Sequence, residues 1–213
     1  MATRDQLIEQ LRDDNRGGVQ VYHPNARALI WGAVTWVIVL APMLWVHALR
    51  PGWMQQLTSY PRFAVETASG LLAVGLLGVL LFQLGIPGSK RRGLTIGIII
   101  SASVWLISLL IGLYYPTLEP SMAGKREFCR YEVLVYAIGP FLLGLYFLQR
   151  AYVLNWTFSA MVVGIASALV PAWLMQLGCM YDPHHALVDH LGPVVAVAIF
   201  ATLVGFLMQR KKS

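Results

Sequence analysis

Long apolar stretches alternate with short polar segments along most of the chain. A helix needs about 20 mostly apolar residues to cross ~30 Å of hydrocarbon, because every backbone N–H and C=O must be paired within the segment. Six stretches meet this condition, at residues 28–48, 63–86, 94–115, 131–148, 153–177 and 188–208. The pattern therefore predicts an all-α, polytopic membrane protein with six transmembrane helices.

Composition and charge support this class and give it an orientation. Hydrophobic residues make up 57% of the chain and charged residues 12%, whereas soluble domains carry about 25% charged residues. Eleven of the 16 Lys and Arg residues fall on the side of the two termini, and basic residues favour the cytoplasmic side. We expect a cytoplasmic N-terminal tail (1–26), a membrane domain (27–209) and a basic cytoplasmic tail (210–213). The net charge of +6 then reflects topology and attraction to lipid headgroups, without direct contact to nucleic acid.

The chain has two cysteines, and the predicted topology places both on the extracytoplasmic side. Cys129 precedes the fourth span, and Cys179 follows the fifth. A short turn around Arg150 joins these spans, so they form an antiparallel hairpin with both thiols at one level. We expect the thiols to meet, and to form a disulfide in an oxidising compartment if their Cα atoms come within ~7 Å.

Histidines and carboxylates follow Cys179 closely, and thiolate with imidazole suits Zn, Cu and softer metals. The spacing is not that of a structural zinc motif, and the adjacent His184 and His185 cannot easily face one ion. Three interpretations stay open: a polar loop with histidines at the membrane surface, reversible capture of a heavy-metal ion, or a constitutive metal site. Capture would use Cys129, Cys179, His184, His185 and His190. Sequence motifs for a tightly bound cofactor are lacking, so we expect none beyond a transient ion.

The residues around Cys179 also indicate whether the protein is a redox sensor or an enzyme. A nearby cation, such as Arg130 or a protonated imidazole, would lower the pKa of a thiol and raise its reactivity, which suits a redox sensor. A thiol oxidoreductase would carry a close vicinal pair of cysteines, which this chain does not have, so we expect no enzyme. An acid–base pair at one depth would have to come from Glu66, Glu132, Asp189 and His190.

Glu66 and Glu132 lie near the extracytoplasmic ends of their predicted helices. We expect both carboxylates to be solvated there. The alternative is that they pair with basic residues of the same side, which are Arg62, Arg126 and Arg130. Few other polar residues lie within the spans, which argues against an ion path across the membrane.

The N-terminal tail contains a short amphipathic helical pattern. Leu7, Ile8 and Leu11 form an apolar stripe among acidic and basic residues, and Gly17 and Gly18 end the pattern. The acidic residues disfavour docking on an anionic membrane, whereas apolar anchors at helical spacing suit a groove on a protein partner. The alternative is a frayed leader, or a helix that packs on the protein's own cytoplasmic loops.

This layout resembles the NrsF family of bacterial membrane anti-sigma factors, the negative regulators of sigma F. The resemblance is most specific at the two cysteines, the run from Cys179 to Leu187 (CMYDPHHAL) and the run from His190 to Pro193 (HLGP). It implies a multi-pass protein of the bacterial inner membrane whose cytoplasmic segment sequesters an extracytoplasmic-function (ECF) sigma factor.

The resemblance also implies roles for particular residues. Cys129 and Cys179 would sense oxidative or heavy-metal stress in the periplasm. The sigma-binding surface would include Leu7, Ile8, Leu11 and Arg12. The alternative function is a small membrane transporter or metal-handling protein that uses the Cys and His cluster as its entrance.

Overall fold

The computed structural model describes residues 23–46, 49–86, 88–89, 91–119, 121–151 and 153–212. Within these residues six helices are long and apolar enough to cross a membrane, which confirms the predicted fold class. They are α2 (Pro24–Val46), α4 (Pro61–Gln83), α5 (Arg92–Gly112), α6 (Cys129–Gln149), α7 (Trp156–Gly178) and α9 (Gly192–Lys212). The described part contains no β-strand, only an isolated bridge between Ser121 and Tyr181.

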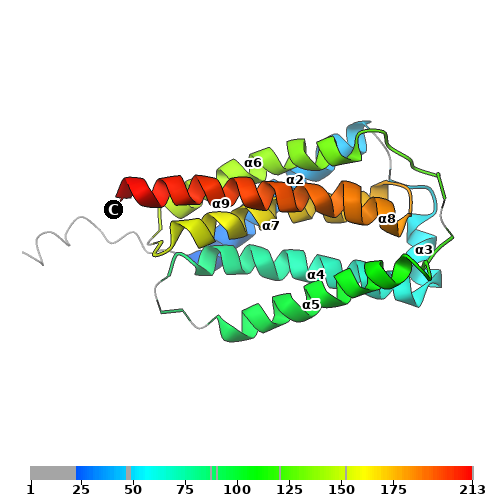
Figure 1. The fold of residues 1–213 in the computed structure, drawn as a ribbon, viewed down its shortest axis with the longest axis horizontal. Coiled ribbons are helices and arrows are strands. Elements are labelled where there is room, and N and C mark those ends of the chain that lie inside the picture. Colours follow the sequence, from blue (N-terminus) through cyan, green and yellow to red (C-terminus); the bar gives the residue numbers. More distant parts are fainter. Residues whose placement is uncertain are drawn as a thin grey trace, which may run out of the picture.

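The six long helices run roughly parallel or antiparallel in one bundle (Figure 1). The start of α2 and the end of α9 lie at the same end of the bundle, which we call the terminal end. The opposite end carries the short helices α3 (Trp53–Ser59) and α8 (Pro183–His185). We call it the cysteine end because Cys129 begins α6 there and Cys179 follows α7.

Helix α7 is the central element of the bundle. In its most apolar window 78% of the residues are buried, against 22% in α2 and in α5. It packs against α2, α4, α6 and α9, whereas α5 packs chiefly against α4. A helix that is hydrophobic on all sides belongs in an interior, and the outer helices turn exposed apolar side chains such as Ile99, Leu142 and Leu203 towards lipid.

Small residues let α7 and α9 approach closely. A Cβ atom added at Gly164 would lie 2.5 Å from the Cβ of Ala201, and one added at Gly205 would lie 2.5 Å from the backbone oxygen of Trp156. No side chain fits at either position, so the two glycines permit the close helix contact that small residues allow in membranes. This contact fixes α9, and with it the histidine segment that precedes α9.

At the terminal end, the base of α2 is tied to the turn between α6 and α7. The guanidinium of Arg27 donates to the carbonyl oxygens of Phe147 and Arg150, each at 3.4 Å. Deeper in the same half, the indole N–H of Trp31 donates to the carbonyl of Pro140 at 2.9 Å. The residues that follow the N-terminal tail are therefore attached to the hairpin that carries both cysteines.

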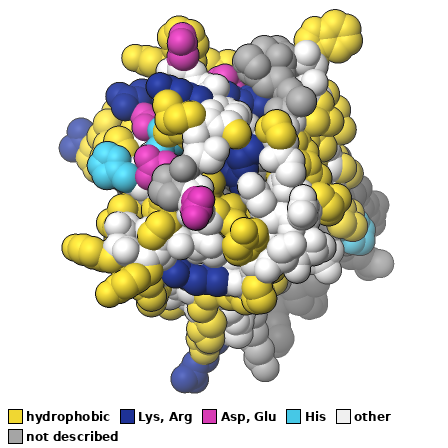
Figure 2. All heavy atoms as spheres, turned by 90° about the vertical axis from the view of Figure 1, so that its right-hand side faces the viewer, with side chains coloured by type: hydrophobic (Ala, Val, Ile, Leu, Met, Phe, Trp, Pro, Cys, Tyr) yellow, Lys and Arg dark blue, Asp and Glu magenta, His cyan; other side chains and the backbone are white. Residues whose placement is uncertain are grey.

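The cysteine end is polar, in contrast to the sides of the bundle. Viewed from this end, basic, acidic and His side chains gather over the face, and hydrophobic side chains project around its rim (Figure 2). The polar face follows from charged residues in the loops and in the helix turns next to them, such as Arg130 and Glu132 in the first turn of α6.

Candidate functional site

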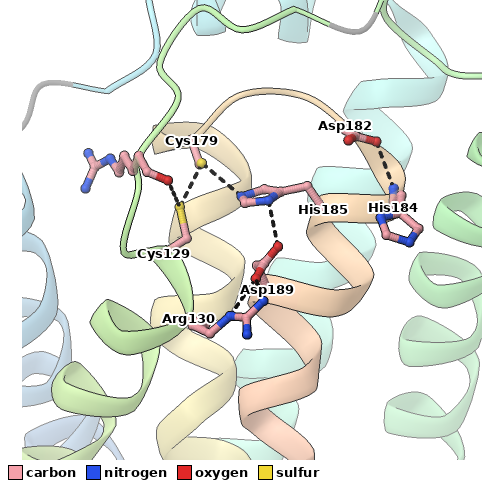
Figure 3. A network of polar contacts seen from close by, with 8 residues as sticks. Cys129, Arg130, Cys179, Asp182, His184, His185 and Asp189 are labelled. Carbon is pink, nitrogen blue, oxygen red and sulfur yellow. Dashed lines mark hydrogen bonds and ion pairs between the residues drawn. The ribbon is translucent and has the colours of Figure 1, made fainter.

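The antiparallel hairpin of α6 and α7 brings the two cysteines together. Cys129 is the first residue of α6, and Cys179 directly follows Gly178, the last residue of α7. Their Sγ atoms are 2.9 Å apart and both residues are free thiols. Cys129 is 2% exposed and Cys179 is fully buried, so the pair forms a closed contact at the end of the bundle (Figure 3).

Arg50 fixes the position of Cys179. Its Nη1 atom donates to the carbonyl oxygens of Cys179 at 2.9 Å and of Gln176 at 3.3 Å, and its backbone N–H donates to the carbonyl of Leu177 at 3.1 Å. The last carbonyls of a helix lack partners within the helix, so this arginine completes the C-terminus of α7. Burial lowers the pKa of Arg50, but its ordinary value is far above neutrality and the guanidinium stays charged.

The connection between α5 and α6 covers Arg50 and the end of α7. The backbone N–H of Ser121 donates to the carbonyl of Tyr181 at 3.4 Å. Gly124 adopts φ +81°, and a Cβ there would lie 3.3 Å from the side chain of Arg50, so the loop crosses directly over the arginine. Tyr181 is buried, and this burial raises the pKa of its phenol. The cover keeps the thiol pair away from bulk solvent.

The thiol of Cys179 is the more acidic partner of the pair. The hydrogen bond from Cys129 holds the pKa of Cys179 below its usual range, and His185 and His190 act in the same direction. The thiolate is the nucleophilic form of cysteine, so Cys179 is the favoured attacking atom. Arg130, expected from the sequence as a nearby cation, instead donates to Asp189 Oδ1 at 2.8 and 2.6 Å.

A capped turn aims His185 at Cys179. Asp182 is the N-cap of α8 and accepts from the backbone N–H of His184 at 3.0 Å, with Pro183 at the first helical position, an arrangement typical of helix starts. His185 Nε2 then lies 3.3 Å from Cys179 Sγ, and His185 Nδ1 lies 2.8 Å from Asp189 Oδ2.

A π-helix, η1 (Ala186–Leu191), continues from α8 into α9 and contains His190. This histidine is 2% exposed, and its ring centroid lies 5.0 Å from that of His185. Of the residues predicted for metal capture, the structure therefore brings Cys129, Cys179, His185 and His190 together. His184 is exposed and points away from the sulfur atoms (Figure 3).

Comparison with protein families identifies the family of the chain. The model of the family NrsF, described as "Negative regulator of sigma F", matches residues 15–210. The chain belongs to the NrsF family. The match includes both cysteines and the three histidines of the Cys179–His190 segment. Comparisons with curated proteins and with solved structures give no match. NrsF membership makes the chain a negative regulator of a sigma factor and confirms the family resemblance found in the sequence.

The residues predicted to bind the sigma factor lie outside the described part of this NrsF chain. They are Leu7, Ile8, Leu11 and Arg12. They also precede residue 15, where the family match begins. Their role therefore stays a prediction from the amphipathic pattern and from the resemblance.

The expectation that Glu66 is a solvated carboxylate is wrong for this NrsF chain. Glu66 is fully buried, where it accepts a hydrogen bond from Gln176 Nε2 and one from Ser108 Oγ at 3.2 Å. Its partners lie on α7 and α5, so local sequence gave no sign of them. Glu132 instead follows the alternative, because it pairs with Arg126 at 2.9 Å.

Sequence reasoning missed two residues that hold the NrsF thiol site. Arg50 was counted only as a basic residue outside the spans, and Gln176 was not singled out. The side-chain amide of Gln176 accepts a hydrogen bond from the indole N–H of Trp105 at 3.0 Å and donates one to Glu66. The backbone carbonyl of Gln176 accepts from Arg50. A lone amide in an apolar span was the available signal, because a buried polar group needs partners.

Proposed function

We propose that this NrsF protein is an anti-sigma factor of the bacterial inner membrane, which sequesters an ECF sigma factor through its cytoplasmic N-terminal segment. Oxidants or heavy metals that react with Cys129 and Cys179 on the periplasmic side release the sigma factor. In this role the protein binds and releases a partner and catalyses no reaction. The observation that carries the proposal is the contact of the two thiols at the end of the bundle opposite the start of α2.

The redox step is the joining of the two thiols. The thiolate of Cys179 attacks one oxygen of a peroxide, the O–O bond breaks, and the leaving oxygen takes up a proton to leave as water or an alcohol. The thiol of Cys129 then displaces hydroxide from the resulting sulfenic acid and gives it the thiol proton, which forms the disulfide and one molecule of water. Two electrons pass from the sulfurs to the peroxide. The buried contact of 2.9 Å between the Sγ atoms favours this intramolecular step.

The hairpin supplies a physical route from the thiols to the tail. Cys129 and Cys179 join the two helices at one end, and Arg27 binds the turn between the same helices at the other end. A change in the helix contact therefore moves the base of α2, which the tail precedes. Coupling between two sites is typically 1–3 kcal/mol, a change of about 5- to 150-fold in affinity, so release is graded.

The partner interface needs more than the apolar stripe. A stable complex buries about 800 Å² on each partner, which three side chains of one short helix cannot supply. We infer that the tail as a whole wraps the sigma factor and folds on contact, as segments of this kind do. Such a complex has modest affinity for its area and is suited to release.

The test of sequestration is co-purification from the native host, with the detergent-solubilised full chain compared with one lacking residues 2–16. A matched pair of variants separates the apolar stripe from the charge of the tail. One variant replaces Leu7, Ile8 and Leu11 by Ser, and the other replaces Glu9 and Asp13 by Ser. We expect the sigma factor with the intact chain and with the Glu9/Asp13 variant only. Its absence from every sample would contradict sequestration and favour the metal-handling alternative.

The sensor half has a separate test, transcription from a sigma-dependent promoter under peroxide or cadmium. Cys129→Ser and Cys179→Ser should each abolish induction, because neither a disulfide nor a dithiolate can form. His184→Ala, an exposed change in the same loop, is the control and should respond normally. Full induction in either serine variant would contradict the sensor role.

A further inference from the structure

Four ligand atoms converge at the cysteine end from α6, the end of α7, α8 and η1. They belong to Cys129, Cys179, His185 and His190, and all lie within 4.8 Å of one another. Tetrahedral zinc has bonds of ~2.3 Å to sulfur and ~2.0 Å to nitrogen, which places its ligand atoms about 3.3–3.8 Å apart. A tetrahedral site needs the sulfurs to separate by about 1 Å from their 2.9 Å contact and the longest distances, at most 4.8 Å, to shorten by about 1 Å.

His190 points independently to a ligand. It is 2% exposed, and among the described residues no group lies at hydrogen-bonding distance and angle to Nδ1 or Nε2, although the ring is near enough to Cys179 to lower the pKa of that thiol. Buried polar groups are nearly always paired, because an unpaired one is unfavourable. A cation beside the thiols would provide the missing partner for one of these nitrogens.

His185 is held in the orientation of a metal ligand. Its Nδ1 lies 2.8 Å from Asp189 Oδ2, which assigns the ring proton to Nδ1 and leaves the lone pair of Nε2 facing Cys179 Sγ at 3.3 Å. Arg130 fixes the other oxygen of the same carboxylate. Histidines that bind metals commonly donate their second N–H to a carboxylate in this way.

The π-helix explains how both histidines reach one point. Residues five apart in an α-helix point about 140° from each other, so His185 and His190 would diverge. In a π-helix the hydrogen bonds run from i to i+5, which stacks such residues, and the two ring centroids are 5.0 Å apart. π-turns of this kind are frequent at functional sites.

We propose that Cys129, Cys179, His185 and His190 form a tetrahedral site for one zinc-class divalent cation, such as Zn²⁺ or Cd²⁺. Binding releases two protons from the thiols, and two thiolates with two neutral imidazoles make the occupied site electrically neutral, as a buried position requires. The side chain of His185 is 13% exposed and provides access. The cation site itself does not depend on the proposed function. Its effect on sensing does rest on that function: a bound cation occupies both thiols and excludes the disulfide.

The test is a titration of the full chain, purified in detergent, reduced and stripped with a chelator, using Co²⁺ as the spectroscopic probe. We expect one Co²⁺ per chain, with the intense visible bands of a tetrahedral site and a sulfur-to-cobalt charge-transfer band, both removed by Zn²⁺. His185→Ala, His190→Ala and His190→Gln should lose the tetrahedral spectrum. The matched control His184→Ala should keep it, and Asp189→Asn should weaken binding about 10-fold or more.

Two results would overturn the site: binding no stronger than in a chain with both cysteines replaced by serine, or an unchanged tetrahedral spectrum in the folded His190 variants. Circular dichroism and gel filtration establish that each variant is folded, and the glutamine variant keeps the size and polarity of the side chain. No sigma factor is present in this titration. Its failure would leave sequestration intact, and a failed co-purification would leave the metal site intact.

Discussion

Replacing Arg50 by Met tests whether the arginine holds Cys179 in place. Met keeps much of the length and apolar contact of the side chain but removes the donors to the carbonyls of Cys179 and Gln176. A hydrogen bond from a charged donor contributes about 1.5–3 kcal/mol, so the two bonds amount to about 3–6 kcal/mol. The variant no longer buries a cation, which offsets part of this loss.

A net loss of about 3 kcal/mol at the end of α7 predicts a change in thiol accessibility. Every 1.4 kcal/mol is a factor of ten, so local opening around Cys179, and with it the rate of alkylation, should rise about 100-fold where reclosing is fast. The assay is maleimide labelling of the reduced protein in detergent, followed by mass spectrometry of the Cys179 peptide. Lys125→Met, an exposed position in the covering loop, is the control. Equal labelling rates in the two variants would refute the anchoring role of Arg50.

Two further substitutions test the packing of the bundle by thermal unfolding in detergent. Gly205→Ala should lower the midpoint by the equivalent of about 1–3 kcal/mol, because its Cβ would meet a backbone carbonyl of α7 at 2.5 Å; Gly75→Ala, with nothing within 4 Å, should leave it equal or higher. An equal loss in both would contradict the close contact of α7 and α9. Trp31→Phe removes the hydrogen bond from the indole N–H to the carbonyl of Pro140 and should cost about 0.5–1.5 kcal/mol, whereas Trp45→Phe, 90% exposed, should be neutral; equal midpoints would refute the role of the buried bond.

Hydropathy predicted the six spans because the bilayer requirement is local to each segment. The bounds differ where polar residues belong to a helix. The fourth span was predicted at 131–148, but α6 begins at Cys129, since Arg130 finds a partner in Asp189. That partner is distant in sequence, so hydropathy excluded Cys129 and Arg130.

The start of the last helical segment shows a signal that was present but not used. The sequence predicted a span from residue 188, whereas helical structure begins at Pro183 and continues through η1 into α9. Asp182 followed by Pro183 is a helix-start signal. The π-turn itself has no comparable local signature, so the meeting of His185 with His190 could not be predicted from their spacing.

The candidate site was predictable in its chemistry and not in its geometry. The position of the two cysteines on either side of one hairpin predicted that their thiols meet, because topology alone places them at one level. The burial of Glu66 and the anchoring by Arg50 depend on α5, α7 and the short α3 segment, which are distant in sequence. Side-chain partners of this kind follow from tertiary packing, which a single sequence does not reveal.

The unequal burial of the helices determines which of them can accept substitutions over evolutionary time. Three quarters or more of the α7 window is buried against less than a quarter in α5, so most α5 positions need only be apolar, and exchanges among Leu, Ile and Val leave their surroundings unchanged. Each α7 position must instead match the shape of its neighbours. Relatives of this chain should therefore diverge fastest along α5 and slowest along α7, even though both helices are equally part of the membrane domain.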